Sequence, residues 1–286
     1  MLMELFSIPT GSLMIDGGAM FGIIPKILWE RMYPANEQNL VRLTMRCLLV
    51  VDGNRKVLFD SGMGDKQGEN FLKHYYPDRK ATLISSLARY GFRPEDITDH
   101  VITHLHFDHC GGSIRYSESG EDLIATFPNA VYWISRLQWN LAQIPNRLES
   151  ASFLKENIEP IGKSSQLKLF DSEFSLTDNI YIRLFNGHTL GLSVGLIKYK
   201  NITLVNISDL IPMAGNITIS WISGYDTNPL NALTEKQQFL EESLQNNYVY
   251  FFFHDADREC CNLKQTPKGI RMDQIFTLNQ LINSEF

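Results

Sequence analysis

The strongest constraint on this chain is a seven-residue run that carries four metal-binding side chains, Thr103-His104-Leu105-His106-Phe107-Asp108-His109. Residues 99–103 before it are rich in β-branched side chains and predict a strand. Residues two apart in an extended backbone point to the same side, so His104 and His106 can face one cation. Asp108 and His109 follow the turn and could reach a second cation about 3.5–4 Å away. Three imidazoles and one carboxylate suit zinc best, with iron, cobalt or manganese as alternatives.

One short loop cannot complete such a site, and three further candidate ligands stand elsewhere in the chain. Each follows directly on an apolar segment that predicts a strand: His188, Asp209 and His254. Open sheets usually gather their sites at the carboxyl ends of strands, so we expect these side chains to contribute to the same site.

The order of these motifs, His-x-His-x-Asp-His, Gly-His, Ser-Asp and His-Asp, resembles that of the metallo-β-lactamase superfamily of hydrolases. Asp60, in Phe59-Asp60-Ser61-Gly62, matches the early Asp-x-Gly element of that superfamily. The resemblance runs from about residue 16 to about residue 258, nearly the whole chain. It implies an α/β (α+β) fold, a four-layer αβ/βα sandwich of two mixed sheets with helices outside.

The resemblance also implies a role for each candidate. A first metal ion would be held by His104, His106 and His188, a second by Asp108, His109 and His254, and Asp209 would bridge the two. A hydroxide between the ions is the expected nucleophile, since metal binding lowers the pKa of water from 15.7 to about 7. Asp108 is expected either to carry a proton to the leaving group or only to bind metal. Asp60 is expected either to accept the N–H of a ligand histidine or to be a plain turn residue. Thr103 is expected either to support a ligand in the same way or to pack within its strand.

Further segments resemble the quorum-quenching lactonase branch of the superfamily: residues 16–26, 127–130 and 253–256. That branch contains N-acyl-homoserine lactonases and relatives that act on other lactones or on organophosphate esters. The resemblance therefore implies a dinuclear hydrolase that opens a lactone ring, with N-acyl-homoserine lactones as the expected substrates. The alternatives are an organophosphate triesterase or an aryl or carboxyl esterase on the same site, and, more distantly, a glutathione-thioester hydrolase.

The chain departs from the lactonase pattern after the bridging aspartate. Several lactonases of the branch carry a tyrosine three residues further on, whereas this chain has Pro212, which has no hydrogen-bond donor. Tyr225 is a possible substitute. Met20, Phe21 and Ile23 are expected either to line an entrance for an acyl chain or to pack in the core or at a contact of a homodimer.

Composition limits the other classes of function. The 286 residues contain no linker or repeat, so we expect one domain, 1–286. The net charge of −6 and the lack of a basic cluster argue against a nucleic-acid partner. No stretch approaches the length of a membrane span, and the first residues do not resemble a signal peptide. Four cysteines without a disulfide pattern favour the cytoplasm.

Local patterns predict several elements. Asp52-Gly53 between two apolar segments predicts a hairpin, and Ser135 is expected to cap a helix after a strand at residues 130–134. Helices are expected over residues 78–90, 146–157 and 234–247, the last one capped by Thr234.

Overall fold

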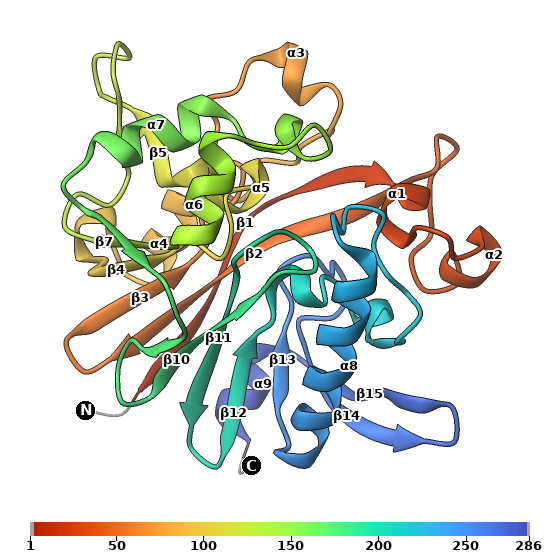
Figure 1. Ribbon diagram of the computed structural model, residues 1–286. Helices are drawn as coiled ribbons and strands as arrows, with labels where there is room; N and C mark the ends of the chain where they lie inside the picture. The colour runs from red at the N-terminus through yellow and green to blue at the C-terminus, as the bar shows by residue number, and fades with distance from the viewer. Residues whose placement is uncertain (1–2, 285–286) are drawn as a thin grey trace. The chain divides into compact units, whose positions relative to one another are not determined.

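The computed structural model describes residues 3–284 and contains two large mixed β-sheets accompanied by helices (Figure 1). The chain forms two compact units. Unit 1 comprises the described part of Met1–Ser12 together with Met45–Glu173. Unit 2 comprises Leu13–Thr44 and the described part of Phe174–Phe286. Each unit is described by itself below.

The first sheet has six strands in the order β1-β2-β3-β4-β7-β8. Their bounds are β1 (Glu4–Asp16), β2 (Leu40–Asp52), β3 (Arg55–Phe59), β4 (Asp99–Val101), β7 (Val131–Ser135) and β8 (Leu167–Phe170). β2 and β3 form the expected hairpin, with Gly53 at the turn in the left-handed region (φ 62°) that glycine tolerates. From β3 to β8 the neighbouring strands are parallel, so β3, β4 and β7 end at the same edge of the sheet.

Shorter elements of unit 1 connect these strands. They are α3 (Glu69–Leu72), α4 (Leu83–Arg89), η1 (Pro94–Asp96), α5 (Phe107–Cys110), η2 (Gly111–Ser113), β5 (Ile114–Tyr116), β6 (Leu123–Ala125), α6 (Arg136–Gln143), η3 (Ser150–Ser152) and α7 (Lys155–Lys163). Ser135 caps α6 as expected, since its hydroxyl accepts the N–H of Gln138 at 3.1 Å.

The second sheet lies in unit 2 and has seven strands in the order β15-β14-β13-β12-β11-β10-β9. Their bounds are β9 (Phe174–Ser175), β10 (Ile180–Phe185), β11 (Leu192–Tyr199), β12 (Ile202–Asn206), β13 (Val249–Phe251), β14 (Cys260–Thr266) and β15 (Gly269–Phe276). Only the pair β12 and β13 is parallel, so these two strands end at the same edge.

The helices of unit 2 are α1 (Gly17–Phe21), α2 (Lys26–Trp29), η4 (Ser208–Leu210), η5 (Ala214–Ile217), α8 (Pro229–Gln245) and α9 (Leu278–Asn283). The long helix α8 covers one face of the second sheet (Figure 1). Its Phe239 and Leu240 share a buried core with Val205 of β12 and Tyr250 of β13.

Three expected helices differ from the structure. The first begins at Leu83 rather than at residue 78, because Thr82 is its cap and Asp78 pairs with Ser12. The last begins at Pro229, capped by Asn228, and Thr234 lies inside it. The helix expected over residues 146–157 is wrong: the chain is irregular from Ile144 to Glu149, and α7 begins only at Lys155.

The expected fold class of two mixed sheets with helices is confirmed. The single-domain expectation stays a prediction. Within residues 3–284, no helix combines the length and the apolar character needed to cross a membrane.

Candidate metal centre

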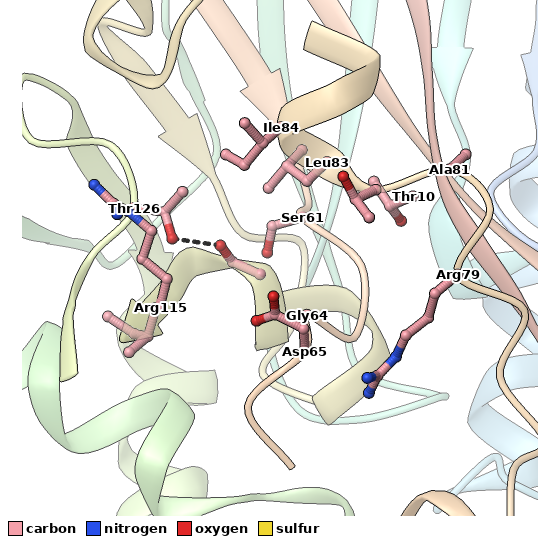
Figure 2. A pocket seen from close by; sticks show the side chains of 13 residues that line it. Thr10, Ser61, Gly64, Asp65, Arg79, Ala81, Leu83, Ile84, Arg115 and Thr126 are labelled. Atoms are coloured by element: carbon pink, nitrogen blue, oxygen red, sulfur yellow. Dashed lines mark hydrogen bonds between the residues drawn. The ribbon is translucent and has the colours of Figure 1, made fainter. Parts of the chain in front are cut away.

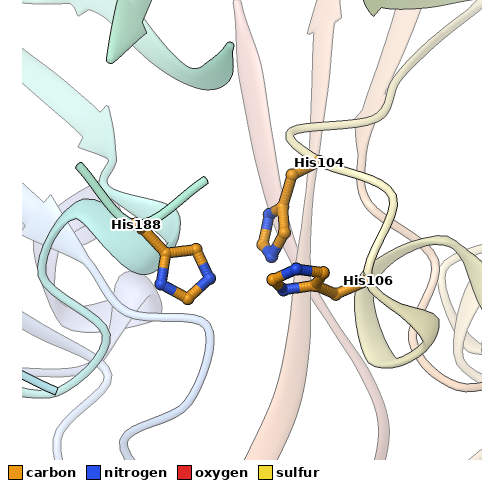
Figure 3. A group of neighbouring side chains, drawn as sticks. All are labelled: His104, His106 and His188. Atoms are coloured by element: carbon orange, nitrogen blue, oxygen red, sulfur yellow. The ribbon is translucent and has the colours of Figure 1, made fainter. Parts of the chain in front are cut away.

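The histidine-rich run of unit 1 forms a buried turn directly after β4. The chain leaves the strand at Val101 and enters the short helix α5 at Phe107. The ring of His104 lies 4.6 Å from that of His106 and 4.0 Å from that of His109, measured between centroids. Figure 3 shows the neighbouring rings of His104 and His106. The run therefore brings its three imidazoles together, as its spacing predicts, and Asp108 lies half-buried beside them.

Asp60 lies beneath this turn and orients two of the imidazoles. Its Oδ2 lies 3.0 Å from Nδ1 of His109 and accepts the hydroxyl of Thr103 at 2.9 Å. Its Oδ1 accepts the backbone N–H of Thr103 at 2.8 Å. Because the Thr103 proton goes to Asp60, its oxygen is available to accept Nδ1–H of His104 at 3.1 Å. The network assigns the Nδ1–H tautomer to both histidines, which leaves a lone pair on each Nε2.

Asp60 and Thr103 are both almost completely buried. Burial raises the pKa of Asp60, while the adjoining His109 and Thr103 act in the opposite direction. Asp60 has a φ of 59°, a left-handed conformation in which aspartate is enriched relative to most residues. Of the two roles expected for Thr103, the contacts match the supporting group and not strand packing, because β4 ends at Val101 and the Thr103 hydroxyl joins the hydrogen-bond network.

His106 contacts a carboxylate from the loop before η3. Its Nε2 lies 3.3 Å from Oε2 of Glu149. Glu149 was not among the candidates from sequence, because residues 146–157 were expected to form a helix. No motif marks it.

Aromatic side chains from α3 and the residues after it pack on the turn beside Asp108. The ring of Phe107 lies 5.0 Å from Phe71 and 4.7 Å from Tyr75, between centroids. Burial raises the pKa of Tyr75, and the negative charge of Asp108 acts in the same direction. The carboxylate of Asp108 is therefore close enough to the phenol of Tyr75 to affect its pKa.

Unit 2 brings its own three candidates together. Asp209 lies in η4 after β12, His254 follows β13, and His188 follows β10. Oδ2 of Asp209 lies 3.5 Å from Nε2 of His188, and Oδ1 lies 3.4 Å from Nε2 of His254. Each carboxylate oxygen thus faces a different imidazole.

The far nitrogens of these two histidines are also fixed within unit 2. Nδ1 of His188, the ring drawn from this unit in Figure 3, lies 2.9 Å from Oδ1 of Asp226. Nδ1 of His254 lies 2.9 Å from the carbonyl oxygen of Thr44, to which it donates. Both Nε2 atoms then carry the lone pair and point towards Asp209. Sequence reasoning named neither Asp226 nor Thr44.

Helix α8 fixes the loop that carries His188. A Cβ atom on Gly187 would lie 2.3 Å from Cα of Ala232, so only glycine fits there. The carboxylate of Glu235 accepts the backbone N–H groups of Asn186 and Gly187 at 2.9 Å. The chain after Asp226 also holds the His188 loop, since the N–H of Thr227 donates to the carbonyl of His188 at 2.9 Å.

The residues expected at an acyl-chain entrance divide into two groups. Met20 and Phe21 are buried, and Phe21 stacks on Trp29 with centroids 5.1 Å apart, which matches the core alternative. Ile23 is 93% exposed and Tyr225 is 45% exposed. A contact with substrate stays a prediction for all four.

Unit 1 also contains a pocket of about 250 Å³ (Figure 2). Ser61 and Thr126 line it, but their hydroxyls already have partners, Ser113 Oγ at 2.9 Å and the Gly112 carbonyl at 2.7 Å. None of the seven candidate ligands is among the described residues that line this pocket. The pocket is therefore separate from the candidate metal centre.

Comparisons with known proteins agree with this geometry. Residues 46–206 match the family model of the Metallo-beta-lactamase superfamily. An N-acyl homoserine lactonase from Bacillus cereus is 23% identical over 277 residues, which cover 90% of this chain and 94% of that protein. A probable metal-dependent hydrolase from Staphylococcus aureus, of known structure, is 26% identical with a TM-score of 0.87, covering 96% of both chains. The dizinc quorum-quenching lactonase AidC, solved with a product, is 22% identical with a TM-score of 0.77, covering 97% of this chain and 96% of its own.

Proposed function

Since the chain belongs to the metallo-beta-lactamase superfamily and is a metal-dependent hydrolase, we propose that it opens lactone rings. Its sequence relatives include N-acyl homoserine lactonases. N-acyl-homoserine lactones are the proposed substrates. Lactonases stand among both the sequence relatives and the structural neighbours, which supports this choice. The observation that carries the proposal is the Asp209 carboxylate, which offers one oxygen towards each of two imidazoles.

We propose that two divalent metal ions bind to the seven candidates. The first would be held by His104, His106 and His188, the second by Asp108, His109 and His254, and both by Asp209. The donor set fits such a centre, because it consists of imidazole nitrogens and carboxylate oxygens. Hydrogen bonds at Nδ1 orient the imidazoles of His104, His109, His188 and His254. A nitrogen-rich set favours zinc over the harder cations.

When bound, such ions supply hydroxide at neutral pH and polarise a carbonyl group. The protein's own residues then have two tasks. Asp60 and Asp226 hold the imidazoles of His109 and His188 in one tautomer and one orientation. Asp108, whose Oδ2 lies 3.9 Å from Nε2 of His109, is proposed to take the proton of the attacking water and give it to the ring oxygen. The acyl C–O bond of the ring breaks, a new C–O bond forms from water, and the product is a hydroxy acid.

Two exposed side chains in unit 2, Ile23 and Tyr225, support a substrate with an acyl chain. The N–H of Gly224 donates to the carbonyl of Ala19 at 2.9 Å, which places the loop of Tyr225 against α1. Ile23 follows α1 and is exposed. We propose that Ile23 and Tyr225 contact the acyl chain. A homodimer contact is the other proposed use of Ile23, and the sedimentation coefficient of Ile23→Ser separates the two, because only a dimer contact changes it.

We also propose that the protein works in the cytoplasm. Its four cysteines are buried, and their spacing in the sequence shows no disulfide framework, as in proteins of a reducing compartment. Fractionation of cells that produce the protein, followed by immunoblotting, tests this assignment.

Proton release from purified protein of known metal content tests the function. Homoserine lactones with short and long acyl chains are the substrates, and His106→Ala is assayed alongside. We expect rapid ring opening near two metal ions per chain, and its loss in the variant. Full metal occupancy without ring opening would reject the lactonase assignment and leave a metal-dependent hydrolase, for which phosphotriesters and aryl esters are the next substrates.

A further inference from the structure

A carboxylate from the loop before η3 lies against the Nε2 atom of His106. In His104, His109, His188 and His254 a hydrogen-bond partner lies on Nδ1. In His106 the partner is on Nε2, where Oε2 of Glu149 lies at 3.3 Å. If Nε2 carries the proton, the lone pair of His106 is on Nδ1.

The loop before η3 is built to hold Glu149 in this position. Oδ1 of Asn146 accepts the backbone N–H groups of Leu148 at 2.9 Å and Glu149 at 3.2 Å, which folds residues 146–149 into an Asx turn. The side-chain amide of Asn146 then donates to Oε1 of Glu149 at 2.6 Å. One carboxylate oxygen is therefore fixed by Asn146, and the other is directed at His106.

Both members of this pair are buried, and an aromatic ring packs on His106. Glu149 is only 5% exposed, and the ring of Phe153 lies 5.2 Å from that of His106, between centroids. A carboxylate withdrawn from water loses much of its hydration, and proteins retain such a group where it has strong polar partners. An imidazole that binds a dication is such a partner, because the cation polarises its N–H.

We propose that Glu149 is a positioning residue for His106 and acts through it on the metal centre. Its carboxylate accepts Nε2–H, fixes the tautomer that presents Nδ1 and makes the imidazole a stronger ligand. This inference rests on the proposed metal centre but not on the identity of the substrate. Removal of the Glu149 charge should weaken the binding of one of the two metal ions and leave the affinity for the other ion unchanged.

Zinc titration of the full-length metal-free protein against a chromophoric chelator tests the inference. Wild type is expected to bind two ions. Glu149→Gln should still bind two, one of them about 10–100-fold more weakly. Asn146→Ala keeps the charge of Glu149 but removes the side chain that holds it in place. This variant should weaken the binding of the same ion. Glu159→Gln, an exposed glutamate on α7, is the matched control and should bind zinc as wild type does.

A second readout separates positioning from a structural effect. In the cobalt-substituted protein, Glu149→Gln should change the visible absorption of one site, and Glu149→Asp should restore part of the wild-type affinity. The lactonase assay should show a lower kcat with little change in KM, since Glu149 is proposed to touch His106 and not the substrate.

The outcomes distinguish this inference from the proposed function. Two ions bound equally well by wild type and Glu149→Gln would overturn the role of Glu149 alone. Failure of wild type to bind two ions would overturn the metal centre and this inference together. Normal metal binding without ring opening would overturn only the lactonase assignment. If Glu149→Gln does not fold, as judged by circular dichroism, the Asn146→Ala titration decides.

Discussion

Oδ2 of Asp60 lies 3.0 Å from Nδ1 of His109, so a residue at the end of β3 fixes an imidazole 49 residues further along the chain. The same carboxylate accepts both the hydroxyl and the backbone N–H of Thr103. Three buried donors therefore depend on one side chain, which links the first sheet to the orientation of the histidine-rich turn.

Asp60→Ala is expected to lower the free energy of unfolding by about 3–5 kcal/mol, because it leaves buried donors without their acceptor. Urea denaturation of the metal-free protein measures this change. Asp65→Ala, an exposed aspartate five residues away, is the control and should stay within about 0.5 kcal/mol of wild type. Equal effects of the two substitutions would show that Asp60 does not organise the turn.

His100 is expected to make stability depend on pH in the acid range. It is fully buried, its Nδ1 donates to the Leu58 carbonyl at 3.1 Å, and its Nε2 accepts from Ser113 at 2.8 Å. Burial lowers the pKa of His100 to about 4. His100 takes up a proton near pH 6.5 in the unfolded chain but only near pH 4 in the folded protein. The contribution of His100 to the free energy of unfolding is therefore fully present above pH 6.5 and is lost as the pH falls from 6.5 to 4, by about 3 kcal/mol.

Unfolding free energies of metal-free wild type and His100→Gln, measured from pH 7 to pH 4, check this prediction. Carboxylates contribute to the acid response of both proteins, so the difference between the two curves isolates His100. A difference that stays constant across the window would contradict the assignment.

Gly187→Ala is expected to disturb the His188 loop, because the added methyl group would overlap the backbone of Ala232 in α8. We expect a loss of about 1–3 kcal/mol in stability, typical of overpacking, together with weaker zinc binding. Gly68→Ala is the control, since a Cβ there meets no atom within 4 Å. Thermal unfolding and zinc titration of both variants provide the measurement, and a wild-type zinc affinity in Gly187→Ala would argue against α8 as the support of this loop.

Metal removal is expected to lower the melting temperature. A ligand that binds only the folded state at 100 times its Kd stabilises it by about 2.7 kcal/mol. Calorimetry with zinc and with a chelator measures the difference. In Asp209→Ala the difference should shrink, because the proposed bridging carboxylate is lost. The same melting temperature for wild type with and without zinc would contradict a metal centre in the folded protein.

The helix expected over residues 146–157 shows where sequence patterns failed. Apolar spacing favoured a helix, but the Asn146 side chain bonds the N–H groups of Leu148 and Glu149 and folds the chain into a turn. Because this competition depends on one side chain, periodicity did not detect it. Glu149 was missed for the same reason.

The sequence by itself determined the type, order and local spacing of the candidate ligands and the strands that precede them, because these depend on neighbouring residues. Only the tertiary structure decided which groups orient those ligands. Asp226 meets His188 across 38 residues, and the Thr44 carbonyl meets His254 across 210. Such partners are selected by the packing of sheets and helices, and a backbone carbonyl leaves no mark in the sequence at all.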